Sequence, residues 1–168
     1  ELLRRCGEPR LDEGDASSLT APHERAIARA LGLEDRPDGC VPLAAWRARQ
    51  MGLEAGAPAA AWGRLTPSHW SLDADPITLL DPAELRLTET QSRAFFDLAR
   101  QLFEADAFML HFAGPTEWLC AHAELDGLPT ASLDRVIGRS VAVWLDVQPL
   151  ARRLRRLQVE LQMLLHAH

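Results

Sequence analysis

Residues 88–103 carry the most regular helical pattern of this 168-residue chain. Thr88, with Gln91 three residues later, is the signature of a capping box at a helix N-terminus. Apolar side chains then recur at helical spacing, at Phe95, Leu98, Ala99, Leu102 and Phe103. The segment therefore predicts an amphipathic helix of about four turns.

Two strand-like segments follow this helix directly. AFMLHF (107–112) and TEWLCAHA (116–123) flank a Gly114–Pro115 break, which predicts a β-hairpin. Alternation along the first strand gives one face to Phe108, Leu110 and Phe112. The hairpin places an antiparallel ladder beside a helix, which already favours the α+β class.

The second strand of this hairpin raises the question of a metal site. Trp118, Cys120 and His122 share one face, and in the simplest register His111 lies opposite Trp118. Two imidazoles and a thiol would then share a surface, as a zinc site requires. The spacing matches no known ligand motif, so ordinary sheet-face residues are favoured. We expect no metal and no cofactor.

Pro149 opens a long C-terminal helix. Its leucines step by four, three, four and three residues, at Leu150, Leu154, Leu157, Leu161 and Leu164. Such a stripe faces a core. We therefore predict an α+β fold with a mixed or antiparallel sheet, a β-hairpin and a long C-terminal helix packed on the sheet.

The domain boundaries follow from composition and pattern. Residues 1–20 predict a loosely ordered arm, and residues 21–168 a single α+β domain. Within that domain, 21–60 is a helical part and 61–168 a strand-containing core. The chain starts at Glu1 without methionine and stops within an apolar helical pattern, so we expect it to be a fragment of a longer chain.

Two short helices are expected in the helical part. The first opens at Thr20 and Pro22 and ends at Gly32. Its expected apolar face consists of Ala26, Ile27, Ala30 and Leu31. The second runs from Pro42 to Gly52.

Composition restricts the classes of function. The formal net charge of −6 argues against a nucleic-acid partner, and no apolar run approaches the roughly 20 residues that cross a bilayer. Three isolated cysteines suit a reducing compartment, so we expect a cytoplasmic protein. The chain contains no lysine and no tyrosine. Schiff-base chemistry, a phosphate-loop lysine and a tyrosine general acid are therefore excluded within it.

The stretch WGRLTPSHW (62–70) is the first candidate for ligand binding. If it is one extended strand, Arg64, Thr66 and Ser68 share a face between two tryptophans, where they could hold an anion. The competing interpretation, which we favour, is an edge strand whose tryptophans cap the core. Pro67 cannot donate to a ladder, so the strand is an edge or is bulged there.

The arginines of the last helix are the second candidate. Arg152, Arg153, Arg155 and Arg156 stand in its first two turns. The helix dipole disfavours cations there by about 0.3–1 kcal/mol each when exposed. Arg152, Arg155 and Arg156 lie away from the leucine stripe. They form either a solvated face paired with nearby carboxylates, which is favoured, or a surface for an acidic protein partner or a small anionic ligand.

The same helix carries apolar side chains opposite its leucines. Val159 and Met163 make its second half apolar on both sides. We therefore expect that half to be buried, in this chain or against a missing segment.

Several segments carry a resemblance to a known family. They are WGRLTPSHW, LLDPAELRLTETQSRAFFDLARQLFEAD, FAGPTEW, LPTASLDRVIGR and LQVELQMLLHAH. Together they resemble the proteobacterial RpfE-type regulatory proteins, also catalogued as cofactor-independent phosphoglycerate mutases. The resemblance covers residues 60–168. In the archaeal-type mutases, a helix similar to the last one here leads into a His-Pro-Val-Asn segment.

The resemblance implies a specific chemistry for the mutases. They belong to the alkaline-phosphatase-like superfamily, where Asp and His residues hold two metals and a serine carries the phosphoryl group. None of those motifs can be placed on this sequence, so no catalytic residue is carried over.

Three hypotheses of function follow. The first is a cytoplasmic RpfE-type domain that is non-catalytic in these residues and binds a partner or a small anionic ligand. The alternative is a metal-dependent phosphotransfer enzyme, or a fragment of one. The third is a structural module that pairs with another copy through an exposed apolar patch, giving a homo-oligomer.

Overall fold

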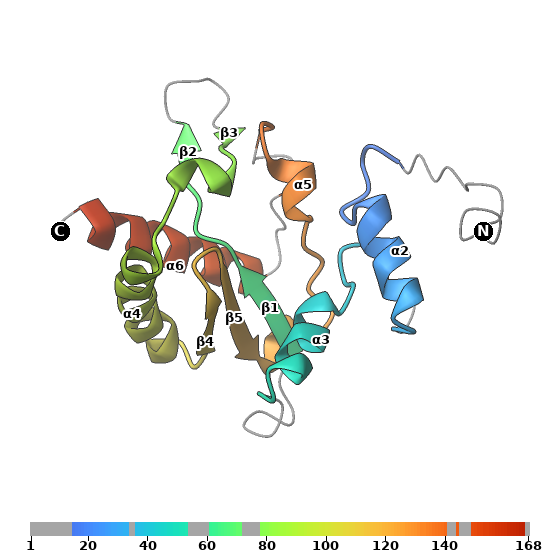
Figure 1. Cartoon of the computed structure of the whole chain (residues 1–168), viewed down its shortest axis with the longest axis horizontal. Coiled ribbons are helices and arrows are strands. Elements are labelled where there is room, and N and C mark those ends of the chain that lie inside the picture. Colours follow the sequence, from blue (N-terminus) through green and yellow to red (C-terminus); the bar gives the residue numbers. More distant parts are fainter. Residues whose placement is uncertain are drawn as a thin grey trace, which may run out of the picture.

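The computed structural model describes residues 15–33, 36–53, 61–71, 78–140, 144 and 149–166; side chains at 70, 71, 162 and 164–166 are not among the described features. Most of the predicted arm, with Cys6, lies outside these residues. The elements form an α+β fold with an antiparallel sheet and a C-terminal helix, as predicted (Figure 1).

A three-stranded antiparallel sheet lies at the centre of the fold. The predicted hairpin forms as β4 (Met109–Gly114) and β5 (Glu117–His122), and β1 (Ala61–Leu65) pairs with the other edge of β5. The strand order is β1-β5-β4. β5 is therefore the central strand, and β1 is an edge strand.

The hairpin register differs from the simplest one by one residue. Phe112 pairs with Trp118, so His111 lies opposite Leu119 instead of Trp118. Pro115 occupies the first position of the turn, where its fixed φ fits, and this moves the turn by one residue. A bulge between Phe112 and Gly114 takes up part of the shift. His111 and His122 consequently lie on opposite faces of the sheet.

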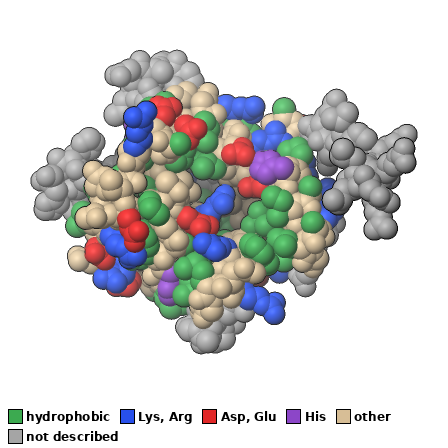
Figure 2. All heavy atoms as spheres, viewed as in Figure 1, with side chains coloured by type: hydrophobic (Ala, Val, Ile, Leu, Met, Phe, Trp, Pro, Cys, Tyr) green, Lys and Arg blue, Asp and Glu red, His purple; other side chains and the backbone are tan. Residues whose placement is uncertain are grey.

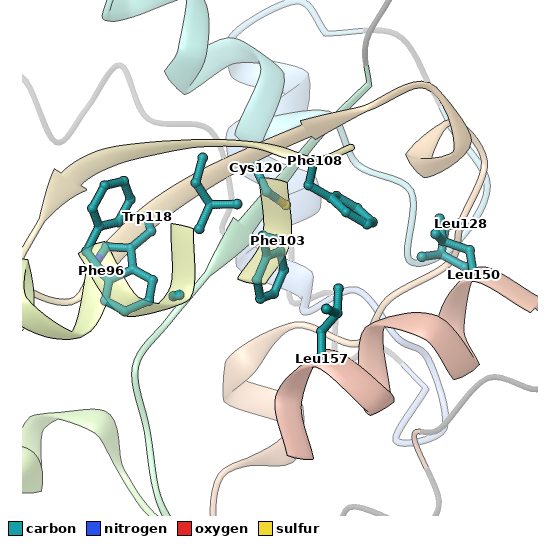
Figure 3. Close-up of a cluster of buried hydrophobic side chains, with 10 residues drawn as sticks. Phe96, Phe103, Phe108, Trp118, Cys120, Leu128, Leu150 and Leu157 are labelled. Carbon is teal, nitrogen blue, oxygen red and sulfur yellow. The ribbon is translucent and has the colours of Figure 1, made fainter. Parts of the chain in front are cut away.

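One face of the sheet packs against α4 (Glu89–Ala105) and α6 (Pro149–His166). The buried cluster consists of Phe96, Ala99, Phe103, Phe108, Leu110, Trp118, Cys120, Leu128, Leu150 and Leu157. Figure 3 shows Leu150 and Leu157 of α6 directed toward the aromatic side chains of the sheet and α4. The predicted leucine stripe therefore does face the core.

The other face of the sheet is covered by α3 (Leu43–Gln50). Leu119 and Ala121 point to this side and are 0% exposed, as is Ala48 of α3. Arg47 of α3 donates through Nε to Glu117 Oε2 at 3.2 Å, which fixes the helix over β5. In Figure 1, α3 lies in front of the sheet and α6 crosses behind it, giving three layers.

The predicted capping box of α4 is confirmed. The Thr88 hydroxyl accepts the Gln91 backbone N–H at 3.3 Å, and the Gln91 side chain accepts the Thr88 N–H at 3.0 Å. Shorter elements complete the fold: β2 (Trp70–Ser71), β3 (Thr78–Leu79), η2 (Pro82–Leu85), η3 (Ala123–Leu125) and α5 (Leu133–Val136).

Helix α2 (Pro22–Ala30) is attached mainly by polar contacts. Ala28 is the buried residue of this helix. The side chains of the predicted apolar face are all exposed: Ala26, Ile27, Ala30 and Leu31. The face predicted to be apolar therefore points to solvent. The carboxylate of Asp38 accepts the N–H groups of Leu19 and Thr20, at 2.7 and 2.9 Å, and these bonds set the orientation of the helix.

The second half of α6 is not buried on both sides within the described part of this chain. Val159 is 55% exposed and Met163 is 67% exposed, whereas Leu157 is 1% exposed. The helix thus buries one side only.

We predict a large difference between two truncations on this helix. Leu157→Ala should lower the free energy of unfolding by about 2–5 kcal/mol, because it leaves a cavity in the core. Val159→Ala, two residues away on the exposed side, is the matched control and should change it by less than about 0.5 kcal/mol. Urea unfolding measures both. Equal losses would show that α6 does not pack as described.

The stability that Asp38 contributes through its hydrogen bonds to Leu19 and Thr20 should depend on pH. Desolvation raises the pKa of Asp38, but hydrogen bonds from Thr20 and Leu19 and the charge of Arg25 outweigh it, so the pKa lies below 3.8. A carboxylate with a lowered pKa stabilises the fold while ionised. That contribution is complete well above pH 3.8 and is lost as the pH falls through the lowered value.

Asp38→Asn imitates the protonated group. Wild type should be more stable than this variant at neutral pH, and the difference should shrink toward zero as the pH falls below 3.8. Urea unfolding across this range measures it. A difference that is constant with pH would contradict the assignment.

Candidate functional site

Arg153 extends from the N-terminal half of α6 into the junction between α4 and the sheet. Its Nη2 donates to the backbone carbonyl of Asp106, and its Nε stands 3.5 Å from Asp106 Oδ2. Its Nη1 is 3.6 Å from Glu124 Oε2. The guanidinium lies 5.1 Å from the centroid of the Phe108 ring, close enough for a cation–π interaction. Arg153 thus joins α6 to the end of α4 and to Phe108, although its Nε has no hydrogen-bond partner among the described residues.

His122 packs in the same junction. Its ring stacks on Phe108 with centroids 4.5 Å apart, and its Nδ1 accepts the Glu124 N–H at 3.1 Å. A neutral imidazole that accepts at Nδ1 carries its proton on Nε2. That nitrogen lies 3.3 Å from Nη2 of Arg153, so two donors face each other there. His122 therefore acts as a packed and capping side chain.

Arg156 is also paired within the chain. Its guanidinium contacts the carboxylate of Asp106, and its Nε lies 3.5 Å from Glu160 Oε1. Asp106 thus receives two arginines, which follows the expectation of pairing with nearby carboxylates. Because its charge is already paired, Arg156 is no longer a candidate for ligand binding.

Arg152 and Arg155 differ from their neighbours. Arg152 is exposed and Arg155 is half-buried. Within the described part of the chain neither has a carboxylate partner. Helical spacing places both on the outer side of α6, together with Val159 and Met163. We call Arg152, Arg155, Val159 and Met163 the outer face of α6.

The candidates of WGRLTPSHW do not form one strand face. β1 ends at Leu65, and the next strand residues are 70–71, so the predicted continuous strand is wrong. Arg64 is exposed on the side of the sheet that α3 covers. Thr66 and Ser68 lie in the connecting segment, where the Ser68 hydroxyl donates to the Thr66 carbonyl at 3.2 Å. Arg64 therefore lies across the sheet from α6 and its arginines.

The proposed grouping of two histidines and a cysteine does not form. The ring of His111 contacts Trp62, with centroids 5.6 Å apart, on the face opposite His122. Burial raises the pKa of the Cys120 thiol to about 12, and burial also raises the pKa of Cys40. Neither thiol is an activated nucleophile.

Metal chemistry of the kind implied by the mutase resemblance needs clustered ligands. In the described ranges, which leave out 1–14, 34–35, 54–60, 72–77, most of 141–148, 167–168 and the side chains of 162 and 164–166, no group of three His, Cys, Asp or Glu side chains could hold a metal ion. The described residues therefore do not fit a two-metal centre. Over the same described residues, no helix is long and apolar enough to span a membrane.

The charge distribution on one face of the molecule is mixed. In Figure 2, basic and acidic side chains stand in small interspersed groups. The face in view therefore presents no continuous basic track of the kind that binds a nucleic-acid backbone.

Sequence reasoning missed Asp106 and Glu124 as the anchors of α6. The arginines at the helix N-terminus did signal a need for nearby carboxylates. Which carboxylates meet that need depends on the α4–β4 turn and on η3, which tertiary packing brings to α6.

No protein-family model, curated protein or solved structure matches the chain. Function is therefore inferred from its own residues.

We predict that Asp106 holds α6 in place. Asp106→Asn should lower the free energy of unfolding by about 1–3 kcal/mol, because Arg153 and Arg156 lose their shared charge partner. Asp97→Asn is the control: Asp97 is exposed and pairs only with Arg100 among the described contacts, so the loss should stay below about 0.5 kcal/mol. Chemical unfolding measures both, and equal effects would contradict the anchoring role.

Proposed function

We propose that this chain is a cytoplasmic RpfE-type domain that works by binding and is non-catalytic in these residues. Its ligand is an acidic group of a partner, a carboxylate or a phosphate, and it is recognised by Arg152 and Arg155 on the outer face of α6.

One observation carries this proposal. Four arginines stand in the first two turns of α6, yet only Arg153 and Arg156 have acidic partners among the described residues. Arg152 and Arg155 remain in the first two turns of the helix, where the positive end of the dipole disfavours a cation; this cost falls off after the first turn and so bears mainly on Arg152. An acidic group bound from outside would offset this cost and supply the missing charge-assisted hydrogen bonds.

Two of the groups that could carry covalent or acid–base chemistry have structural roles instead. Cys120 is buried with a raised pKa, and His122 is stacked on Phe108 and caps η3. These observations favour binding over catalysis in the described residues. Metal-dependent phosphoglycerate mutase activity of this chain would refute the non-catalytic part of the proposal.

The binding part is tested with labelled poly-L-glutamate at low ionic strength. The double variant Arg152→Gln, Arg155→Gln should bind about 2- to 30-fold more weakly, because each pair at the surface contributes about 0.2–1 kcal/mol. Raising the salt concentration should weaken wild-type binding. Fluorescence polarisation gives the dissociation constants.

Arg49→Gln and Arg139→Gln are the matched controls. Both residues are exposed arginines outside α6, and changing them together removes the same two charges as the double variant. They should leave binding nearly unchanged. Titration of inorganic phosphate in the same assay distinguishes a small anion from an acidic polypeptide. Equal affinity of the double variant and wild type for both probes would overturn the proposal.

A further inference from the structure

A third arginine stands beside the two unpaired ones on α6. Arg155 lies three residues beyond Arg152, and Arg156 lies four residues beyond it. Side chains at these two spacings are neighbours on a helix surface, with Cβ atoms about 5–6 Å apart. Arg152 is therefore the neighbour of both other arginines. An acidic group bound to Arg152 stands close to Arg156 as well, although Arg156 is already paired.

Two carboxylates of the chain occupy Arg156 from different sides. Its Nη2 contacts Oδ2 of Asp106, and its Nε lies 3.5 Å from Oε1 of Glu160. A guanidinium carries five N–H groups in a fixed fork, so one carboxylate does not exhaust it. Asp106 takes one end of this fork, and Glu160 stands at the Nε side. That side of Arg156 would otherwise face an external acidic group.

The two carboxylates differ in how firmly they hold Arg156. The side chain of Asp106 is 22% exposed and is shared with Arg153, which ties it to the anchoring of α6. Glu160 is 43% exposed and has Arg156 as its partner among the described contacts. Ion pairs between exposed side chains are weak. Glu160 is therefore the partner that an external acidic group can replace without loosening the helix.

We infer that Glu160 is an internal competitor of the acidic ligand. Its carboxylate occupies the Nε side of Arg156, which limits the site to Arg152 and Arg155 and weakens the binding of an acidic group. When Glu160 is neutral, Arg156 joins the site as a third arginine. This inference rests on the proposed function and concerns the regulation of the same site, through an autoinhibitory contact within α6.

The test compares two carboxylate variants in the binding of labelled poly-L-glutamate at low ionic strength. Glu160→Gln removes the competing charge and keeps the size of the side chain. Glu89→Gln is the matched control, because Glu89 pairs with Arg93 at the same i, i+4 spacing near the start of α4, far from Asp106 at its end. Glu160→Gln should tighten binding about 1.5- to 5-fold more than Glu89→Gln does, the effect of one exposed ion pair. Fluorescence polarisation measures this ratio.

Two further measurements locate the effect at Arg156. In an Arg156→Gln background, Glu160→Gln and Glu89→Gln should change the affinity equally, because the arginine to be released is gone. In the Glu160→Gln chain, poly-L-glutamate should shift the NMR signal of the Arg156 Nε–H more than it does in wild type. Circular dichroism and urea unfolding check that each variant keeps α6 folded. The NMR comparison does not depend on how well the Arg156→Gln chain folds.

The failure of this inference is distinguishable from that of the proposed function. Equal effects of Glu160→Gln and Glu89→Gln, in a chain whose binding Arg152→Gln with Arg155→Gln weakens, would overturn the competitor role and leave acidic recognition standing. An excess effect of Glu160→Gln that persists in the Arg156→Gln background would do the same, because Glu160 would then act only by repelling the probe. Unchanged binding by the double arginine variant would overturn both.

Discussion

The burial of β5 on both of its faces determines the arrangement of the other elements. Trp118, Leu119, Cys120 and Ala121 are consecutive and all buried, so neither face of the central strand can meet water. A three-stranded sheet cannot shield itself, and each face needs a helical layer. Helices α4 and α6 supply one layer and α3 supplies the other. Glycine at position 63 fits this crowding, because a Cβ there would lie 3.0 Å from Sγ of Cys120.

The position of α6 in this arrangement is set by two different forces. Leu150 and Leu157 bury apolar surface against the sheet, which is strong but permits rotation and sliding. Arg153 adds direction, since its contacts with Asp106 and Glu124 are possible in one orientation of the helix only. That orientation is also what places Arg152 and Arg155 outward. The anchoring of the helix and the exposure of its outer face are thus consequences of the same contacts.

The sequence predicts local structure well where one signal dominates, as in the capping box at Thr88 and the stripe that includes Leu157. It fails where turn geometry or long-range contacts decide. The hairpin register depends on the turn position that Pro115 prefers, and this places His111 away from His122. The orientation of α2 is decided by Asp38, 19 residues from Leu19 in sequence, and its apolar periodicity says nothing about which side docks. The same limit applies to the candidate site. The charge of Arg156 is visible in the sequence, whereas its pairing with Asp106 across 50 residues is not.

The division of the four arginines argues that the outer face of α6 is more than a solvated surface. A helix that needed only solubility could place glutamates among its outer positions and gain pairs at i, i+4, as Arg156 does with Glu160. One turn beyond Arg152 and Arg155, at i+4, stand Arg156 and Val159 instead of glutamates. A substitution at Arg152 or Val159 would be a surface change, free of the core packing that constrains Leu157. The fold itself therefore does not require this pattern of side chains, which agrees with the binding role proposed above.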